Sequence, residues 1–285
     1  MTTLLNSLSL ASILGLVSMG LAIIFGIRGV INLAHGELFV LGAYVTVWVN
    51  SAGMSMWIGV IAAPIVVAAI GWIIELTVVR RLYSRPLDTL VATFGLSIVI
   101  REAIKLGFGK GNQNVPLPMS GQVSVLGTAY PQYRIFLMFC SAVLLGLVAL
   151  ISLRTDVGVK VRAVIQNRSM AESMGINGRR IDQSVFMLGS ALAGVAGALM
   201  APLVTLNPTI GPTFLARSFL VVIVGGVGSV LSAIGGAVFI GMAEGFISSI
   251  ILPIYAQMVL FALAIVVLCF RPQGLFRRAS GTDDR

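Results

Sequence analysis

Long apolar segments follow one another along almost the whole chain, with short polar segments between them. The first runs from Leu4 to Ile27, and the others cover residues 31–50, 56–79, 88–108, 134–153, 182–204 and about 216–270. A run of about 20 apolar residues can cross the roughly 30 Å of bilayer hydrocarbon as a helix, whereas barrel strands are about ten residues long and alternate in polarity. Because backbone groups in lipid need partners within their own segment, the pattern predicts an all-α, polytopic transmembrane helical bundle.

The last apolar segment is too long for two helices. The glycine-rich stretch 225–229 and Pro253 interrupt it, and we expect them to divide it into three short or broken helices. The chain, residues 1–285, is then a single transmembrane domain of about eight or nine elements that include broken or re-entrant helices.

Composition agrees with this prediction and excludes several classes of protein. The chain is 58% hydrophobic and only 10% charged, whereas soluble domains are about a quarter charged. A soluble enzyme, a disordered protein and a DNA-binding domain are therefore poor interpretations, despite the net charge of +9. Cys140 and Cys269 both lie in apolar runs, and we expect small buried hydrophobic residues there rather than a disulfide or a metal site.

The basic residues predict the orientation of the bundle. They gather in the loops 80–87 and 154–181 and in the tail that carries Arg271, Arg277, Arg278 and Arg285. By the positive-inside rule these three segments face the cytoplasm. Three spans before Arg80 would place the N-terminus outside, but the parity reverses if 27–50 is re-entrant rather than spanning.

The segment from Arg28 to Glu37 is unusually polar for its position between two apolar helices. It holds Asn32, His35 and Glu37, and glycines that loosen a helix surround them. One interpretation is a helix broken at membrane depth, which must line protein or a water-filled cavity. The other is a short cytoplasmic turn with His35 and Glu37 near the interface. Even in a broken helix, these two side chains could cap or pin it rather than contact a substrate.

A second glycine-rich interruption, with Gly225, Gly226 and Gly228, lies in the other half of the chain. Paired interruptions point to a translocation site at the interface of two repeats, although no repeat is visible residue by residue and close packing explains many glycines equally well. Glu244 is central in its apolar run and is either a pathway residue or the partner of a neighbouring helix. The candidate translocation path therefore comprises Asn32, His35, Glu37, Gly225, Gly226, Gly228 and Glu244.

Two further features concern a source of energy. No G-x-x-x-x-G-K-[ST] motif is present, so ATP binding by that motif must occur in another polypeptide. The loop 154–181 is amphipathic. Within it, we expect a short helix from Ser169 to Met174 that ends at Gly175. A basic solvated loop would need no such helix, whereas a helix with an apolar face is suited to docking in a groove of another protein.

Several ordered motifs together give the chain a family resemblance. They are GVINLAHGELFVLGAY (29–44), RPLDTLVATFGLS (85–97), RAVIQNRSMAESMGI (162–176), VVIVGGVGS (221–229) and RPQGLF (271–276). The chain resembles the LivH-type permeases, the membrane subunits of ATP-binding-cassette importers for branched-chain amino acids and for urea. Within the family, the sequences of these motifs resemble those of the UrtB-like urea permeases most.

The resemblance implies a multi-pass permease of the bacterial inner membrane that is not itself an enzyme and carries no cofactor. It implies a second related permease, two ATP-binding subunits that hydrolyse ATP, and an extracytoplasmic substrate-binding protein. The segment that matches the family's ATPase-coupling helix comprises Ala171, Glu172, Ser173, Met174, Gly175 and Ile176.

The substrate and the transport class remain open at this level. Uptake of urea or short amides is the main hypothesis, because the motifs resemble the urea branch most. Sparse central charge is compatible with a small neutral solute but adds little. Branched-chain amino acid uptake is the alternative within the family. A stand-alone channel for a small neutral solute would need no ATPase. A secondary carrier would depend on an ion gradient.

Overall fold

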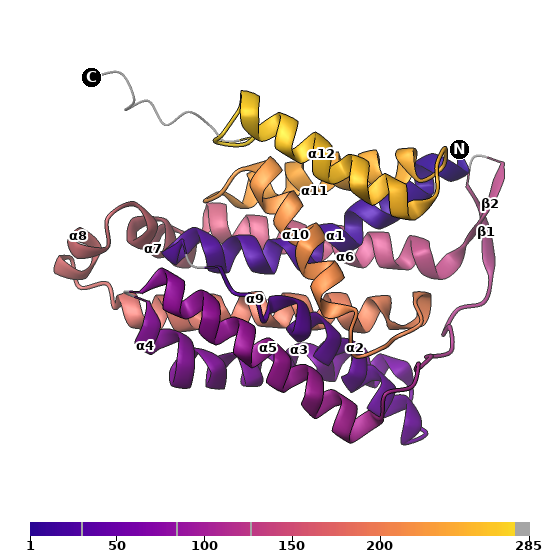
Figure 1. Cartoon of the computed structure of the whole chain (residues 1–285), viewed down its shortest axis with the longest axis horizontal. Helices are drawn as coiled ribbons and strands as arrows, with labels where there is room; N and C mark the ends of the chain where they lie inside the picture. Colours follow the sequence, from indigo (N-terminus) through magenta and orange to yellow (C-terminus); the bar gives the residue numbers. More distant parts are fainter. Residues whose placement is uncertain (30, 84, 126, 277–285) are drawn as a thin grey trace.

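The computed structural model describes residues 1–29, 31–83, 85–125 and 127–276, and within them the chain is a helical bundle with one short hairpin (Figure 1). The prediction of an all-α membrane bundle is confirmed. Its elements are α1 (Thr2–Arg28), α2 (His35–Ser51), α3 (Met56–Ile74), η1 (Glu75–Val79), α4 (Arg80–Leu82), α5 (Pro86–Phe108), β1 (Gln122–Val125), β2 (Thr128–Pro131), α6 (Gln132–Arg154), α7 (Asp156–Gln166), α8 (Arg168–Ser173), α9 (Gly178–Met200), η2 (Ala201–Leu203), α10 (Gly211–Gly225), α11 (Val230–Ile247) and α12 (Pro253–Phe270).

Among the described residues, five stretches are long and apolar enough to cross a membrane, namely 2–27, 56–82, 132–154, 178–203 and 230–247. Of these, α1 and α9 are the most deeply buried, and they cross the centre of the bundle. They touch where Gly20 and Gly189 bring the two backbones together. Most other helices pack around this central pair.

The two ends of the bundle differ in charge. One groove of about 590 Å³ brings together Arg80, Arg81, Arg168 and Arg179 from the two predicted basic loops. These loops therefore share one end, which the positive-inside rule assigns to the cytoplasm. Of the basic tail, Arg271 is described, whereas Arg277, Arg278 and Arg285 lie outside the described residues.

The opposite, outer end holds the start of α1 and the loop between α5 and α6. Asn6 accepts hydrogen bonds from Tyr130 (3.1 Å) and Arg134 (2.8 Å), beside the β1–β2 hairpin. The backbone of Gln113 in the same loop pairs with that of Leu206. The N-terminal end of α1 therefore lies at the end of the bundle opposite the basic loops, which is the arrangement that three crossings before Arg80 require.

The crossing between α1 and α3 is only partly helical. Beyond the inner end of α1, the described residues 31–34 are non-helical and lead back into the bundle, and α2 begins at His35 beside Val17, in the middle of α1. From there α2 continues to the outer end. This arrangement is the predicted broken helix at membrane depth, not a short cytoplasmic turn.

A similar break occurs in the second half, but not at the predicted place. Residues 204–210 return from the outer end of α9, and α10 begins at Gly211, where its carbonyl oxygen meets Gly36 at the start of α2. The partner of the 28–37 break is therefore the segment before α10. The glycine-rich stretch 224–230 is instead the turn between α10 and α11.

The two breaks share a local sequence that the fold makes recognisable. Asn32 and Asn207 each accept a hydrogen bond from the backbone N–H two residues later, at 3.0 and 2.9 Å. Each asparagine is followed at equal spacing by a glycine at the helix start and by a phenylalanine. The rings of these phenylalanines, Phe39 and Phe214, stack with centroids 4.1 Å apart. Because α2 and α10 leave this meeting point in opposite directions, the two breaks and the helices that follow them form an inverted pair.

The cysteine prediction is partly wrong. Cys140 is half-buried in α6, whereas Cys269 is exposed on α12. The reason is that α12 is peripheral and much of its apolar surface lies on the outside of the bundle.

Candidate functional site

The central feature of the molecule is the half-helix junction, which we define as residues 32–39 and 207–214. Glu37 lies in the first turn of α2, and its side chain is only 1% exposed. Its carboxylate lies against Gly211, so closely that a side chain at that glycine would overlap it. Because the N-terminal end of a helix carries partial positive charge, the start of α10 favours this carboxylate.

A cation from a third helix neutralises Glu37. Arg101 of α5 reaches Oε1 of Glu37 with Nη2 at 2.6 Å and Nε at 3.2 Å. A buried carboxylate without a partner would be costly, so this ion pair holds α2, α5 and the start of α10 together. Arg101 was not among the residues singled out from the sequence. Its position within an apolar run was the available signal.

His35 holds α2 to the central helix α1. Its ring is fully buried, and Nε2 lies 3.0 Å from the carbonyl oxygen of Val17. Because a carbonyl oxygen only accepts hydrogen bonds, this contact requires the proton on Nε2. Gly20 leaves room for the ring. The geometry fits a side chain that pins the broken helix.

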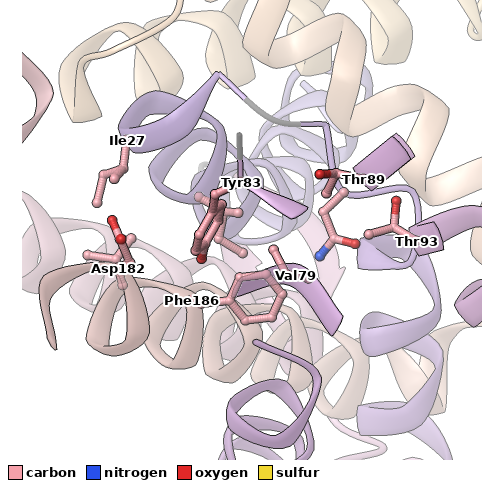
Figure 2. Close-up of a pocket in the computed structure, with 10 residues that line it drawn as sticks. Ile27, Val79, Tyr83, Thr89, Thr93, Asp182 and Phe186 are labelled. Carbon is pink, nitrogen blue, oxygen red and sulfur yellow. The ribbon is translucent and has the colours of Figure 1, made fainter. Parts of the chain in front are cut away.

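Asn32 lines a small cavity on the cytoplasmic side of the junction. Figure 2 shows its walls, where Thr89 and Thr93 of α5 stand opposite Asp182 and Phe186 of α9. The accessible volume is about 10 Å³, which is room for one water and not for an amino acid or urea. The cavity beside the junction is therefore closed to such solutes in this structure.

The non-helical backbone at this depth has protein partners. Thr93 accepts a hydrogen bond from the N–H of Leu33 at 3.2 Å, and the N–H of His35 bonds the carbonyl of Asn32 at 3.2 Å. Irregular backbone is tolerated at membrane depth only where such partners or water are available. The break is therefore a stable part of the bundle, because protein groups satisfy its backbone.

The remaining predicted path residues are not at the junction. Gly226 and Gly228 have positive φ angles of 101° and 96° in the turn after α10, and Gly26 at the inner end of α1 faces Gly228. Gly225 packs against Ser232 in the same corner. This turn lies a whole helix away from Gly211, about 20 Å along α10.

Of the two interpretations of Glu244, the geometry fits the partner of a neighbouring helix. Its buried carboxylate pairs with Arg217 at 3.2 Å, joining α11 to α10. Within the described residues it forms no hydrogen bond or ion pair with Glu37 or His35. The structure thus brings together Asn32, His35 and Glu37, and it leaves Glu244 and the three glycines elsewhere.

The predicted docking helix is present at the cytoplasmic end. It is α8, which begins one residue earlier than expected and is capped by Asn167, whose Oδ1 accepts the N–H of Met170 at 3.0 Å. Gly175 ends it with a positive φ angle of 84°. The segment Ala171–Ile176 closes with a hydrogen bond from the N–H of Ile176 to the carbonyl of Ala171.

One side of α8 is bonded to the bundle, and the other side is exposed. Ala171 is buried, and Arg168 bonds both Glu172 (2.9 Å) and Asp182 at the start of α9 (3.0 Å). Met170 and Met174 project outward, with Met174 78% exposed. Adaptable methionines on an anchored helix are typical of a surface that binds another protein.

The chain is similar in sequence to known proteins over most of its length. Residues 3–268 match the family described as branched-chain amino acid transport system / permease component. LivH of Salmonella typhimurium, a high-affinity branched-chain amino acid transport system permease protein, is 31% identical over 96% of this chain and 94% of its own. LivM of the same organism, a permease protein of the same system, is 24% identical over 91% of this chain and 67% of its own.

A solved structure shares the fold. PsaBC from Streptococcus pneumoniae in complex with Fab aligns with a TM-score of 0.55 over 94% of this chain and 91% of that chain, at 12% identity. At that identity the likeness concerns the fold alone.

Proposed function

The chain belongs to the family of branched-chain amino acid transport system permease components, and we propose that it is the membrane subunit of an ATP-driven importer for branched-chain amino acids. The observation that carries this proposal is the family match, which spans residues 3–268 and thus the whole bundle. The inner membrane of a bacterial cell is the corresponding location.

Branched-chain amino acids replace urea as the favoured substrate. The relatives that share about a third of the residues over nearly the whole chain are named for branched-chain amino acid transport. The argument from sparse central charge also loses force, because the ion pair of Glu37 and Arg101 lies at the junction. Urea uptake becomes the alternative outcome of the experiment below.

ATP hydrolysis belongs to partner subunits in this proposal, and α8 is the element on which they act. Met170 and Met174 enter a groove of the ATPase, and Arg168 passes the displacement to Asp182 at the start of α9. Glycines bring α9 into backbone contact with α1 and α2, so its movement changes the packing at the junction. The ATPase does work because it favours one of two packings of the bundle.

Two further partners complete the proposed importer. A second permease related to this chain forms the other half of the membrane unit, as LivH and LivM are both permease proteins of one system. A substrate-binding protein delivers the amino acid to the outer end, where the hairpin β1–β2 and the loop before it are exposed.

Uptake by the reconstituted importer tests the proposal. The permease pair, ATPases and binding protein are placed in liposomes with ATP available to the ATPases, and entry of labelled leucine is measured in competition with isoleucine, valine and urea. We expect ATP-dependent uptake that isoleucine and valine inhibit and urea does not. Entry of solute into vesicles that hold only this chain would instead indicate a channel, and uptake that follows an ion gradient without ATP would indicate a secondary carrier.

A surface substitution tests the role of α8. Met174→Glu should lower ATP-dependent uptake by about tenfold or more, because a charge replaces an apolar anchor of a docking interface. Val159→Glu is the matched control, since Val159 is an exposed apolar residue of the neighbouring α7. Equal uptake by both variants would contradict the assignment of α8.

A further inference from the structure

The outer half of α5 carries an ion pair whose carboxylate is exposed. Lys105 and Glu102 form an ion pair at 2.6 Å, and the Glu102 side chain is 54% exposed. Next to them, Arg101 turns inward to Glu37. Along one turn of α5, therefore, Arg101 serves the interior and Glu102 faces outward, while Lys105, whose side chain is 22% exposed, lies at the edge between them.

The depth of this pair excludes ordinary surface solvation. Glu37 lies 14 residues before the outer end of α2 at Ser51, which is about 21 Å along a helix. Arg101 contacts Glu37, so Glu102 is next to a residue at the middle depth of the bundle. Ionisable side chains at such depth face protein or a water-filled path rather than lipid.

The surroundings of the pair are apolar in a definite arrangement. Ile98 and Val99 lie one turn before Glu102 on α5 and Leu106 one turn after it, and all three are exposed. This face of α5 thus presents a carboxylate and an ammonium group beside branched aliphatic side chains. The charges of Glu102 and Lys105 cancel each other.

We infer that this face of α5 is a substrate contact, at which Glu102 and Lys105 bind the two charged groups of a zwitterionic amino acid. The inference rests on the proposed function and names residues for it. Lys105 binds the carboxylate, Glu102 binds the ammonium group, and the branched side chain lies on Ile98, Val99 and Leu106. When the substrate binds, two ion pairs with its charged groups replace the single Glu102–Lys105 pair, and the net charge of these groups stays zero. A neutral zwitterion therefore fits the site better than an anion or a cation.

The same helix supplies a matched control. Arg85 and Asp88 form a pair with the same spacing as Glu102 and Lys105, at 3.6 Å, but at the cytoplasmic end of α5 with both side chains well exposed. A general effect of removing an exposed charge from α5 would appear at both ends. A substrate effect would appear only at Glu102 and Lys105.

The experiment measures leucine uptake and ATP hydrolysis in the complete importer carrying Glu102→Gln, Lys105→Gln or Asp88→Asn. Losing one charged contact to the substrate should lower uptake by about tenfold in each of the first two variants. Binding-protein-stimulated ATP hydrolysis, and both activities of Asp88→Asn, should stay within about twofold of the unmodified complex.

Two results would overturn the inference. One is unchanged leucine uptake in both Glu102→Gln and Lys105→Gln. The other is a joint fall of uptake and hydrolysis with loss of the second permease from the purified complex, which would assign the pair to subunit assembly. An unmodified complex that imports urea and not leucine would contradict the proposed function itself, and this inference with it.

Discussion

The two half-helices α2 and α10 begin alike but are held in different ways. Both follow an asparagine turn, and both place a glycine and a phenylalanine at the meeting point. The start of α2 adds His35 and Glu37, whereas the equivalent positions before and after Gly211 are Ile210 and Pro212. The backbone arrangement of the two half-helices is thus symmetric, whereas their polar side chains differ. Side-chain bonds to α1 and α5 fix α2, whereas α10 has an apolar start and its ion pair lies further along.

Removing the cation at the junction is expected to have the largest effect. Arg101→Met leaves the Glu37 carboxylate buried without its partner, which should destabilise the protein by about 3 kcal/mol and abolish transport. The matched variant Arg217→Met breaks the pair with Glu244 away from the junction. It should lower stability similarly, but the folded fraction should still transport. Thermal unfolding in detergent and uptake per folded complex separate the two effects, and equal transport by both variants would refute the distinction between the halves.

A single methyl group at the meeting point should have an intermediate effect. A Cβ atom at Gly36 would overlap the carbonyl group of Gly211, so Gly36→Ala should destabilise the protein by about 1–3 kcal/mol. Gly95 of α5 has no atom within 4 Å of such a Cβ, and Gly95→Ala should be neutral or slightly stabilising. If thermal unfolding shows the same midpoint for both variants, α2 and α10 do not meet as described.

The two asparagine turns allow the finest comparison. Asn32→Ala and Asn207→Ala each remove one side-chain hydrogen bond to the backbone, which is worth about 1 kcal/mol. Asn207 also accepts a bond from the Thr209 hydroxyl at 2.7 Å, but that bond is exposed to water and contributes less. Asn32 is buried and Asn207 is only partly buried, so Asn32→Ala should cost more. Unfolding temperatures of the two variants and of the double variant test this order, and a larger loss for Asn207→Ala would reverse it.

The apolar runs were sufficient to predict the bundle, and Gly175 and its neighbours were sufficient to predict the helix of the cytoplasmic loop. The pairing of the two breaks was not predictable in the same way. The sequence drew attention to polar residues at 28–37 and to glycines at 224–230, but the true counterpart near Gly211 has Ile210 and Pro212 where the first break has His35 and Glu37. Only three residues in each break match, and their common position appears only after folding.

The partner of Glu37 was hidden for a different reason. Arg101 lies 64 residues further along the chain, so no local pattern joins the two. Similarly, periodicity alone could not assign Glu244 to a path or to a partner, because the answer depended on Arg217 of the preceding helix.

Accessibility of the cavity beside the junction tests most directly whether this chain is a gate that partner ATPases open. Thr93→Cys places a thiol in that closed cavity, in a background in which Cys140 and Cys269 are replaced by alanine. In the complete importer, a small hydrophilic thiol reagent should modify it while ATP is being hydrolysed and should fail to do so without nucleotide. Equal modification in both conditions, or modification in neither, would contradict the account.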